Sequence, residues 1–156
     1  MIKRIGFTVV AVLALALAAQ AADMDSGTWV MNVAKSTNNG LDRSQTHVIS
    51  MEGGWRINRR HGVDKDGNPT RSSSITKNDG VARPWVGNGP DALGMLTTST
   101  KSDDFHWKQV SVAITGKVRL TQAVVISPDG KVKTNTITRV DKDGNTSNSV
   151  AVYDKQ

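Results

Sequence analysis

The sequence of 156 residues contains no cysteine, one glutamate, and only four tryptophans, two phenylalanines and one tyrosine. Without cysteine, the chain has no disulfide, no thiol nucleophile and no cysteine-ligated metal. Apart from the single glutamate, Glu52, the carboxylates are aspartates, and these lie almost entirely in turn-forming segments. The sequence therefore places no pair of carboxylates for acid–base chemistry.

Long apolar runs are also scarce. One run, residues 5–19, follows the basic pair Lys3 and Arg4 and precedes small residues around Gln20. This arrangement is typical of a secretory signal peptide, and the run is shorter than the about 20 apolar residues of a membrane-spanning helix. We predict a signal peptide over residues 1–21 and one domain over residues 22–156, periplasmic or secreted, without stable membrane insertion.

Basic charge is modest and dispersed. The chain carries 20 basic and 14 acidic residues, a formal net charge of +6. In the densest basic group, strand alternation turns Arg59 away from Arg56 and Arg60. Nucleic-acid-binding proteins gather such residues on one face or along one element, so the sequence predicts no nucleic-acid partner.

After the signal peptide the sequence has the pattern of an all-β protein. Runs rich in Val, Ile, Thr and Trp alternate with clusters of Gly, Asp, Asn and Pro. Ten strands are expected, at 28–34, 44–51, 54–60, 70–77, 81–86, 93–100, 104–114, 117–127, 131–140 and 147–154. Helical periodicity is absent from this part of the sequence.

Tight turns connect these strands. Residues that tolerate positive φ lie between neighbouring strands, at Asp66-Gly67, Asp79-Gly80, Asp129-Gly130 and Asp143-Gly144. Strands joined in this way are antiparallel neighbours, and closure of the sheet removes both exposed edges. We predict an antiparallel up-and-down meander closed into a β-barrel of about 8–10 strands, with the first and last strands paired.

The strands differ in the apolar face they offer. Val118, Leu120, Val124 and Ile126 share one parity, which predicts a drier face for strand 117–127. Strand 70–77 reads TRSSSITK and offers little to a core. We expect that strand to be a wall facing water or a wet cavity.

The hexapeptide VDKDGN occurs twice, at residues 63–68 and 140–145, and resembles a calcium loop. An EF-hand loop needs glycine at position 6 and glutamate at position 12. Counted from Asp64, Gly67 is at position 4 and Ile75 at position 12, and the second copy fails in the same way. Both copies are therefore predicted to be hairpin turns.

Catalytic and metal-binding patterns are not visible. His47, His61 and His106 lie in different segments and in none of the spacings typical of metal ligands. Nucleophile, base and orienting group are likewise not placed together. We predict that the protein is not an enzyme and holds neither a metal nor a cofactor.

The tryptophans supply much of the large apolar surface, each from a different strand. A shared core cluster is one interpretation of Trp29, Trp55 and Trp107. Trp85 precedes the glycine- and proline-rich residues 86–91, which could form a rim. An aromatic side chain at a barrel rim is a candidate for ligand contact.

The stretch GTWVMNVAKS, residues 27–36, resembles the start of small exported bacterial lipocalin-like proteins with a GTWxLNxxKS-type N-terminus. The likeness continues at residues 86–92, 127–131 and 152–156, and more widely to the calycins, whose first strand carries G-x-W. The resemblance implies a lipocalin-like barrel without an established activity. It also implies that Trp29 lies at the closed end of the barrel under a late-strand arginine, for which Arg139 is the candidate.

The leading hypothesis is therefore an exported, monomeric, non-catalytic barrel that binds a small apolar or amphipathic ligand. Trp55, Trp85 and Trp107 are predicted to contact the ligand at the wall or rim, and Arg59 to anchor a polar group. The alternative is a cell-envelope interaction or structural protein with a filled barrel, binding protein or polysaccharide through its loops.

Overall fold

The computed structural model describes residues 23–37, 42–87, 94–117 and 119–156. The predicted signal peptide, most of the predicted rim at residues 86–91, and Val118 lie outside the described residues.

The described chain consists of strands and turns with one short 3-10 helix. The elements are β1 (Gly27–Met31), η1 (Val33–Lys35), β2 (Ser44–Glu52), β3 (Trp55–Val63), β4 (Pro69–Thr76), β5 (Arg83–Pro84), β6 (Val86–Gly87), β7 (Met95–Lys101), β8 (His106–Ala113), β9 (Arg119–Ile126), β10 (Val132–Val140) and β11 (Thr146–Lys155). Nine of the ten predicted strands are confirmed within a few residues. No helix in this part of the chain is long and apolar enough to cross a membrane.

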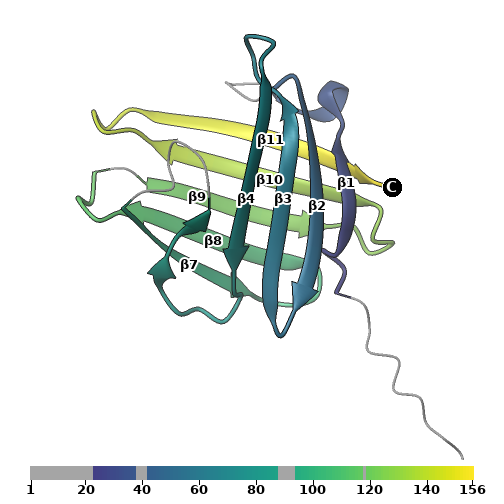
Figure 1. The fold of residues 1–156 in the computed structure, drawn as a ribbon, viewed down its shortest axis with the longest axis horizontal. Coiled ribbons are helices and arrows are strands. Elements are labelled where there is room, and N and C mark those ends of the chain that lie inside the picture. The colour runs from purple at the N-terminus through teal and green to yellow at the C-terminus, as the bar shows by residue number, and fades with distance from the viewer. Residues whose placement is uncertain (1–22, 38–41, 88–93, 118) are drawn as a thin grey trace, which may run out of the picture.

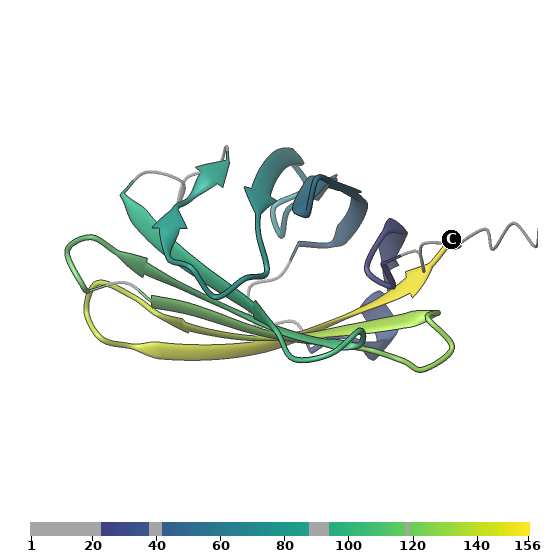
Figure 2. The ribbon, with the colours of Figure 1, turned by 90° about the horizontal axis from the view of Figure 1, so that it is seen from below.

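All strands belong to one antiparallel sheet, in the order β5-β7-β8-β9-β10-β11-β1-β2-β3-β4-β6. The predicted pairing of the first and last strands is confirmed, since Trp29 of β1 is opposite Lys155 of β11. In Figure 1, β2, β3 and β4 run steeply across β7–β11. Figure 2 shows that the sheet curls so strongly that its two halves face each other.

Residues 77–87 run between the two edges of the curled sheet, at β4 and β7, and we call this region the seam. The prediction of one continuous strand over 81–86 is wrong: β5 pairs with β7, whereas β6 pairs with β4. Trp85 lies between them, and Pro84 carries no N–H for a longer ladder. The turn at Asp79-Gly80 is also not a hairpin, because the Gly80 amide donates to the Ser99 carbonyl at 2.8 Å. We call residues 77–87 the seam segment.

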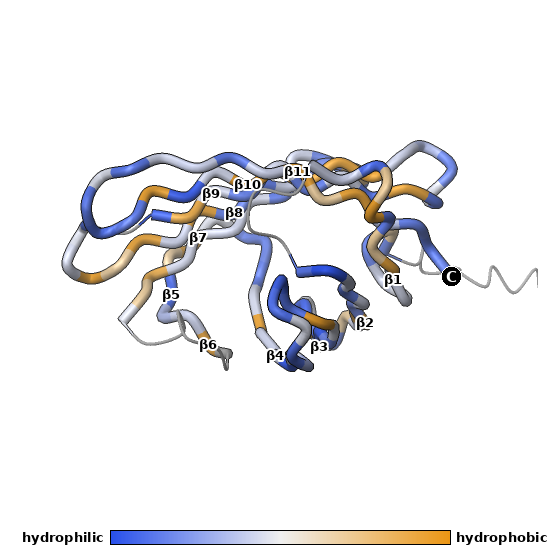
Figure 3. Tube along the Cα trace, turned by 90° about the horizontal axis from the view of Figure 1, so that it is seen from above, coloured by the Kyte–Doolittle hydropathy of each residue, from blue (hydrophilic) through white to orange (hydrophobic). Residues whose placement is uncertain are grey.

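Apolar and polar side chains are both buried by the sheet, Val124 and Ile126 among the first and Thr97, Ser99 and Ser111 among the second. Figure 3 shows β3 and β4 as mostly hydrophilic, with hydrophobic positions recurring along β8 and β9. The predicted drier face of β9 is confirmed by buried Val124 and Ile126, and β4 alternates between exposed and half-buried residues as expected. The apolar core cluster is small and consists of Trp29, Met31, Ile49, Ile126, Ala151 and Tyr153.

Both VDKDGN copies form the predicted turns. In the first, Asp64 Oδ1 accepts hydrogen bonds from the amides of Asp66 at 2.9 Å and Asn68 at 2.8 Å. In the second, Asp141 accepts the equivalent bonds at 2.8 and 2.9 Å. The aspartates are therefore occupied by their own backbone, a usual role of aspartate in turns.

Candidate functional site

A pocket of about 220 Å³ lies at the seam. Its walls come from the beginning of β3, the end of β4, the inner face of β7 and the seam segment. The apolar lining consists of Trp55, Ile75, Val81, Pro84, Trp85 and Val86. The polar lining consists of Thr76, Lys77, Arg83, Thr97 and Ser99.

Trp55 forms one aromatic wall. It begins β3 directly after the Gly53-Gly54 turn, and its side chain remains 38% exposed. The Arg83 guanidinium lies 5.4 Å from the centre of its ring, and the Lys77 ammonium 5.8 Å. Two cations therefore stack on this tryptophan, an arrangement that stabilises them through the ring quadrupole.

Asp79 holds Arg83 in place. The two Arg83 amino groups donate to the two Asp79 oxygens at 2.6 and 2.8 Å, a bidentate geometry that favours the charged forms. This hydrogen bonding lowers the pKa of Asp79, and the charges of Arg83 and Lys77 act in the same direction. The positive charge of the pocket wall is thus partly neutralised.

Trp85 forms the second aromatic wall. Its backbone amide donates to the Met95 carbonyl at 2.8 Å, which attaches the seam segment to β7. Its indole Nε1 is buried and has no hydrogen-bond partner among the described residues. A buried donor without a partner costs free energy, so this position of the Trp85 side chain is disfavoured by its unpaired N–H.

The hydroxyl groups of the β7 wall are already paired. Thr97 and Ser111 share a hydrogen bond of 2.8 Å, and Ser99 donates to Asn78 Oδ1 at 2.5 Å. These groups therefore present a structured polar wall rather than free donors.

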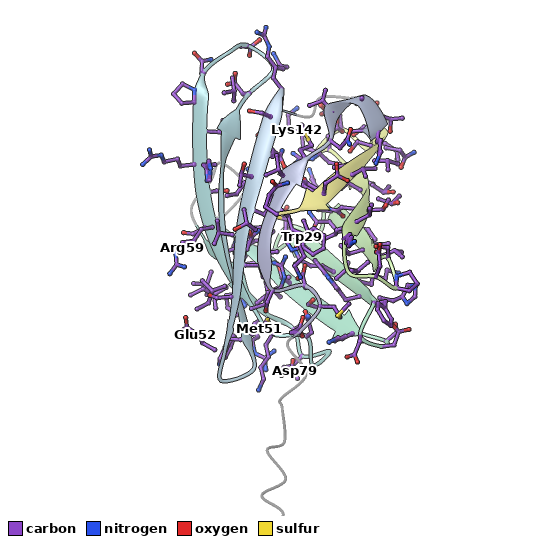
Figure 4. The ribbon with its side chains drawn as sticks, turned by 90° about the vertical axis from the view of Figure 1, so that its right-hand side faces the viewer. Trp29, Met51, Glu52, Arg59, Asp79 and Lys142 are labelled. Atoms are coloured by element: carbon purple, nitrogen blue, oxygen red, sulfur yellow. The ribbon has the colours of Figure 1, made fainter. Side chains whose placement is uncertain are left out.

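The structure brings together two of the four predicted ligand residues. Trp55 and Trp85 line the pocket. Trp107 is buried elsewhere, with the Arg56 guanidinium 4.9 Å from the centre of its ring. Arg59 is exposed on the outer face of β3, and Figure 4 shows it pointing away from the space between the layers.

Sequence reasoning missed the Asp79–Arg83 pair and the aliphatic wall around Ile75 and Val81. The charged residues of the seam segment were in the sequence, at a spacing of four. Their pairing depends on how the segment folds over Trp55, and no local sequence pattern predicts that fold.

A second cluster of charged side chains is buried at the end of the sheet near Trp29. Asp25 accepts hydrogen bonds from Arg56 Nε at 2.5 Å and from Lys133 Nζ at 3.2 Å. The Trp29 indole donates to the Asp25 carbonyl at 2.8 Å, so this residue links the cluster to the apolar core.

The cations over Trp29 differ from the arginine that the resemblance implies. Lys133 Nζ lies 4.4 Å and Lys155 Nζ 5.0 Å from the centre of the ring. Arg139, the expected partner, is six residues further along β10, about 20 Å away at the rise of an extended strand. Lysines from two neighbouring strands occupy the predicted position of the arginine.

Burial shifts the pKa values of this cluster. Burial lowers the pKa of Lys133 to about 7, although Asp25 opposes the shift. For Asp25, burial alone would raise the pKa, but the charges of Arg56 and Lys133 outweigh it and lower the value to about 2. Burial, together with Lys133 and Arg56, lowers the pKa of His47 well below its ordinary value, so this imidazole is neutral at pH 7.

None of these shifted groups lines the pocket. Within the described ranges, no group of three His, Asp or Glu side chains is placed to hold a metal ion. The pocket offers an apolar surface to a small molecule, whereas its two ionisable residues, Lys77 and Arg83, are paired with Asp79.

Comparison with known proteins found no family model that matches the chain and no match among curated proteins.

Proposed function

We propose that the protein is a non-catalytic binding protein that takes a small, mostly apolar molecule into the seam pocket. The observation that supports this proposal is the pocket itself, in which Trp55 and Trp85 supply aromatic walls and four aliphatic side chains complete the apolar part of the lining. Ligand sites are commonly concave, apolar and aromatic, with a few polar groups.

The volume sets the size of the ligand. Drug-sized molecules occupy pockets of about 300–1,000 Å³, and an apolar cavity of about 150 Å³ holds benzene. At about 220 Å³, the pocket suits a molecule of one or two fused rings.

We further propose the barrel closure, export and monomeric state that the sequence predicts. The curled sheet would close into a lipocalin-like barrel through the seam segment, and the protein would work as an exported monomer outside the cytoplasm. The up-and-down order, with β11 beside β1, supports this closure, because among the described strands each neighbour from β7 round to β4 is hydrogen-bonded to the next.

Calorimetric titration with naphthol, an uncharged two-ring probe at pH 7, tests the binding function. Trp55→Ala and Trp85→Ala should each weaken binding tenfold to a hundredfold, the loss expected from about 1.5–3 kcal/mol of aromatic burial. Arg59→Ser is the matched control, because Arg59 is not part of the pocket lining, and it should bind as the wild type does. Equal binding by all four proteins would contradict the proposed site.

A second candidate function is the envelope interaction. Arg59, His61 and Arg71 are exposed together on the outer face of β3 and β4, and His61 is the cross-strand partner of Arg71. This face would attract anionic polymers. Retention of wild type, but not of Arg59→Ser/Arg71→Ser, on a sulfated polysaccharide column would support it, and equal elution would exclude it.

A further inference from the structure

We propose that the seam segment is a clasp whose closure is linked to ligand binding, so that the pocket forms only when the clasp is closed. This inference rests on the proposed function, because it concerns the same pocket. It adds a two-state element, the clasp, whose equilibrium the ligand shifts.

The seam segment supplies most of the pocket wall. Six of the eleven lining residues, among them Arg83 and Trp85, belong to the seam segment. The remaining walls, from β3, β4 and β7, lie on opposite edges of the sheet. If the segment leaves these edges, more than half of the lining leaves with it, and a ligand has affinity for the closed state alone.

The attachment of the clasp is weak. β5 makes two residue pairs with β7, and β6 makes two with β4. One further bridge joins Asp79 to Thr100. By contrast, β10 and β11 share nine pairs. Segments with few backbone pairs and exposed side chains open locally at much lower free energy than long ladders.

Opposing contributions make the free energies of the open and closed states similar. The stacking of Arg83 on Trp55 of β3 favours closure, and the fork to Asp79 within the clasp holds Arg83 in position for it. The unpartnered Nε1 of Trp85 disfavours it, because this donor can bond to water once the segment opens. An apolar ligand buried against Trp55 and Trp85 adds contacts to the closed state only.

Amide hydrogen exchange with and without naphthol tests the linkage. The reporters are the amides of Gly80 and Trp85, which donate to Ser99 and Met95 across the seam. At a naphthol concentration about 100 times its Kd, their exchange should slow up to about a hundredfold. The Asn145 amide, bonded inside the distant β10–β11 turn, is the control and should not change.

A reversible lock provides the second measurement. Pro84 and Leu96 are opposite each other in the β5–β7 ladder. The next position along the ladder carries the hydrogen bond from the Trp85 amide to the Met95 carbonyl. Pro84 and Leu96 therefore form a non-hydrogen-bonded pair, in which the Cα atoms and side chains are closest. A disulfide fits this spacing, and the chain has no other cysteine. The oxidised Pro84→Cys/Leu96→Cys protein should bind naphthol more tightly than the same protein after reduction, and should release it at least tenfold more slowly.

The outcomes separate the two proposals. Binding to wild type with slowed seam amides, or binding to the oxidised variant alone, supports the linkage. Binding with unchanged seam amides and no difference between oxidised and reduced variant overturns the linkage and leaves the proposed function intact. Absence of binding to every form overturns both.

Discussion

The buried cluster near Trp29 and the seam contain the same chemical groups in different surroundings. Each has an aspartate bonded to an arginine, together with a tryptophan that carries stacked cations. The side chains of Asp25 and Arg56 are 5% and 6% exposed, whereas those of Asp79 and Arg83 are 30% and 31% exposed. Burial makes the first pair costly to break, whereas water and salt weaken the second. From this comparison we expect the buried cluster to contribute more to the free energy of unfolding than the exposed pair at the seam.

The largest effect is expected from breaking the buried cluster. Asp25→Ala leaves Arg56 and Lys133 buried without their counter-ion, which should cost about 3–5 kcal/mol of unfolding free energy. Urea denaturation followed by tryptophan fluorescence measures this loss. The matched variant Asp79→Ala should leave the urea midpoint unchanged, and equal losses in both variants would remove the distinction between the regions.

The alkaline pH dependence isolates Lys133. Its pKa is about 7 in the folded protein and 10.5 in the unfolded chain. The unfolded state therefore binds more protons between these values, and stability should rise with pH at about 1.4 kcal/mol per unit, by up to about 4 kcal/mol from pH 7 to 10. Lys133→Met should abolish this rise in urea titrations, and a rise that survives the substitution would assign it to other groups.

The acid side isolates Asp25. Its pKa falls from 3.8 to about 2 on folding, so its contribution is complete above pH 4 and is lost as the pH falls toward 2. The loss should be about 2 kcal/mol. Denaturation of Asp25→Asn over this range should show a correspondingly flatter profile. If the two profiles run parallel, the acid transition does not depend on this carboxyl.

The smallest effect is expected at the seam. Asp79→Asn keeps an acceptor for the Val81 amide but loses the charged fork to Arg83. Exchange of the Gly80 and Trp85 amides should accelerate several-fold, while the urea midpoint stays that of the wild type. Unchanged exchange at these amides would show that the fork does not hold the clasp closed.

Local chemistry explains why most strands could be predicted. Alternation in 117–127 and the Asp-Gly turns of the two hexapeptides depend on residues that are neighbours in the chain. The seam was mispredicted because Pro84 and Trp85 interrupt a run that otherwise resembles one strand. The two halves of that run pair with strands on opposite edges, and a one-dimensional pattern contains no information about such edges.

The candidate site was predicted in part for the same reason. Trp85 was expected to contact ligand because it precedes glycine- and proline-rich residues that could form a rim, and Trp55 was expected as a further wall or rim residue. Arg59 was expected as an anchor, but it is exposed on β3 and is not part of the pocket lining. Trp55 has the same parity on β3, and it lines the pocket because it begins the strand, where Arg83 of the seam segment lies over its ring. Trp107 is likewise held under Arg56, a contact between β8 and β3 that only the curled sheet creates.

By itself, the sequence determined the all-β class, the antiparallel order and the turns, because hydrogen-bonded hairpins depend on neighbouring residues. The tertiary structure decided which charges are buried, which lysines cover Trp29, and that Trp55 and Trp85 line one pocket. These contacts join residues far apart in the chain, so they depend on how the strands are arranged in space and not on neighbouring residues.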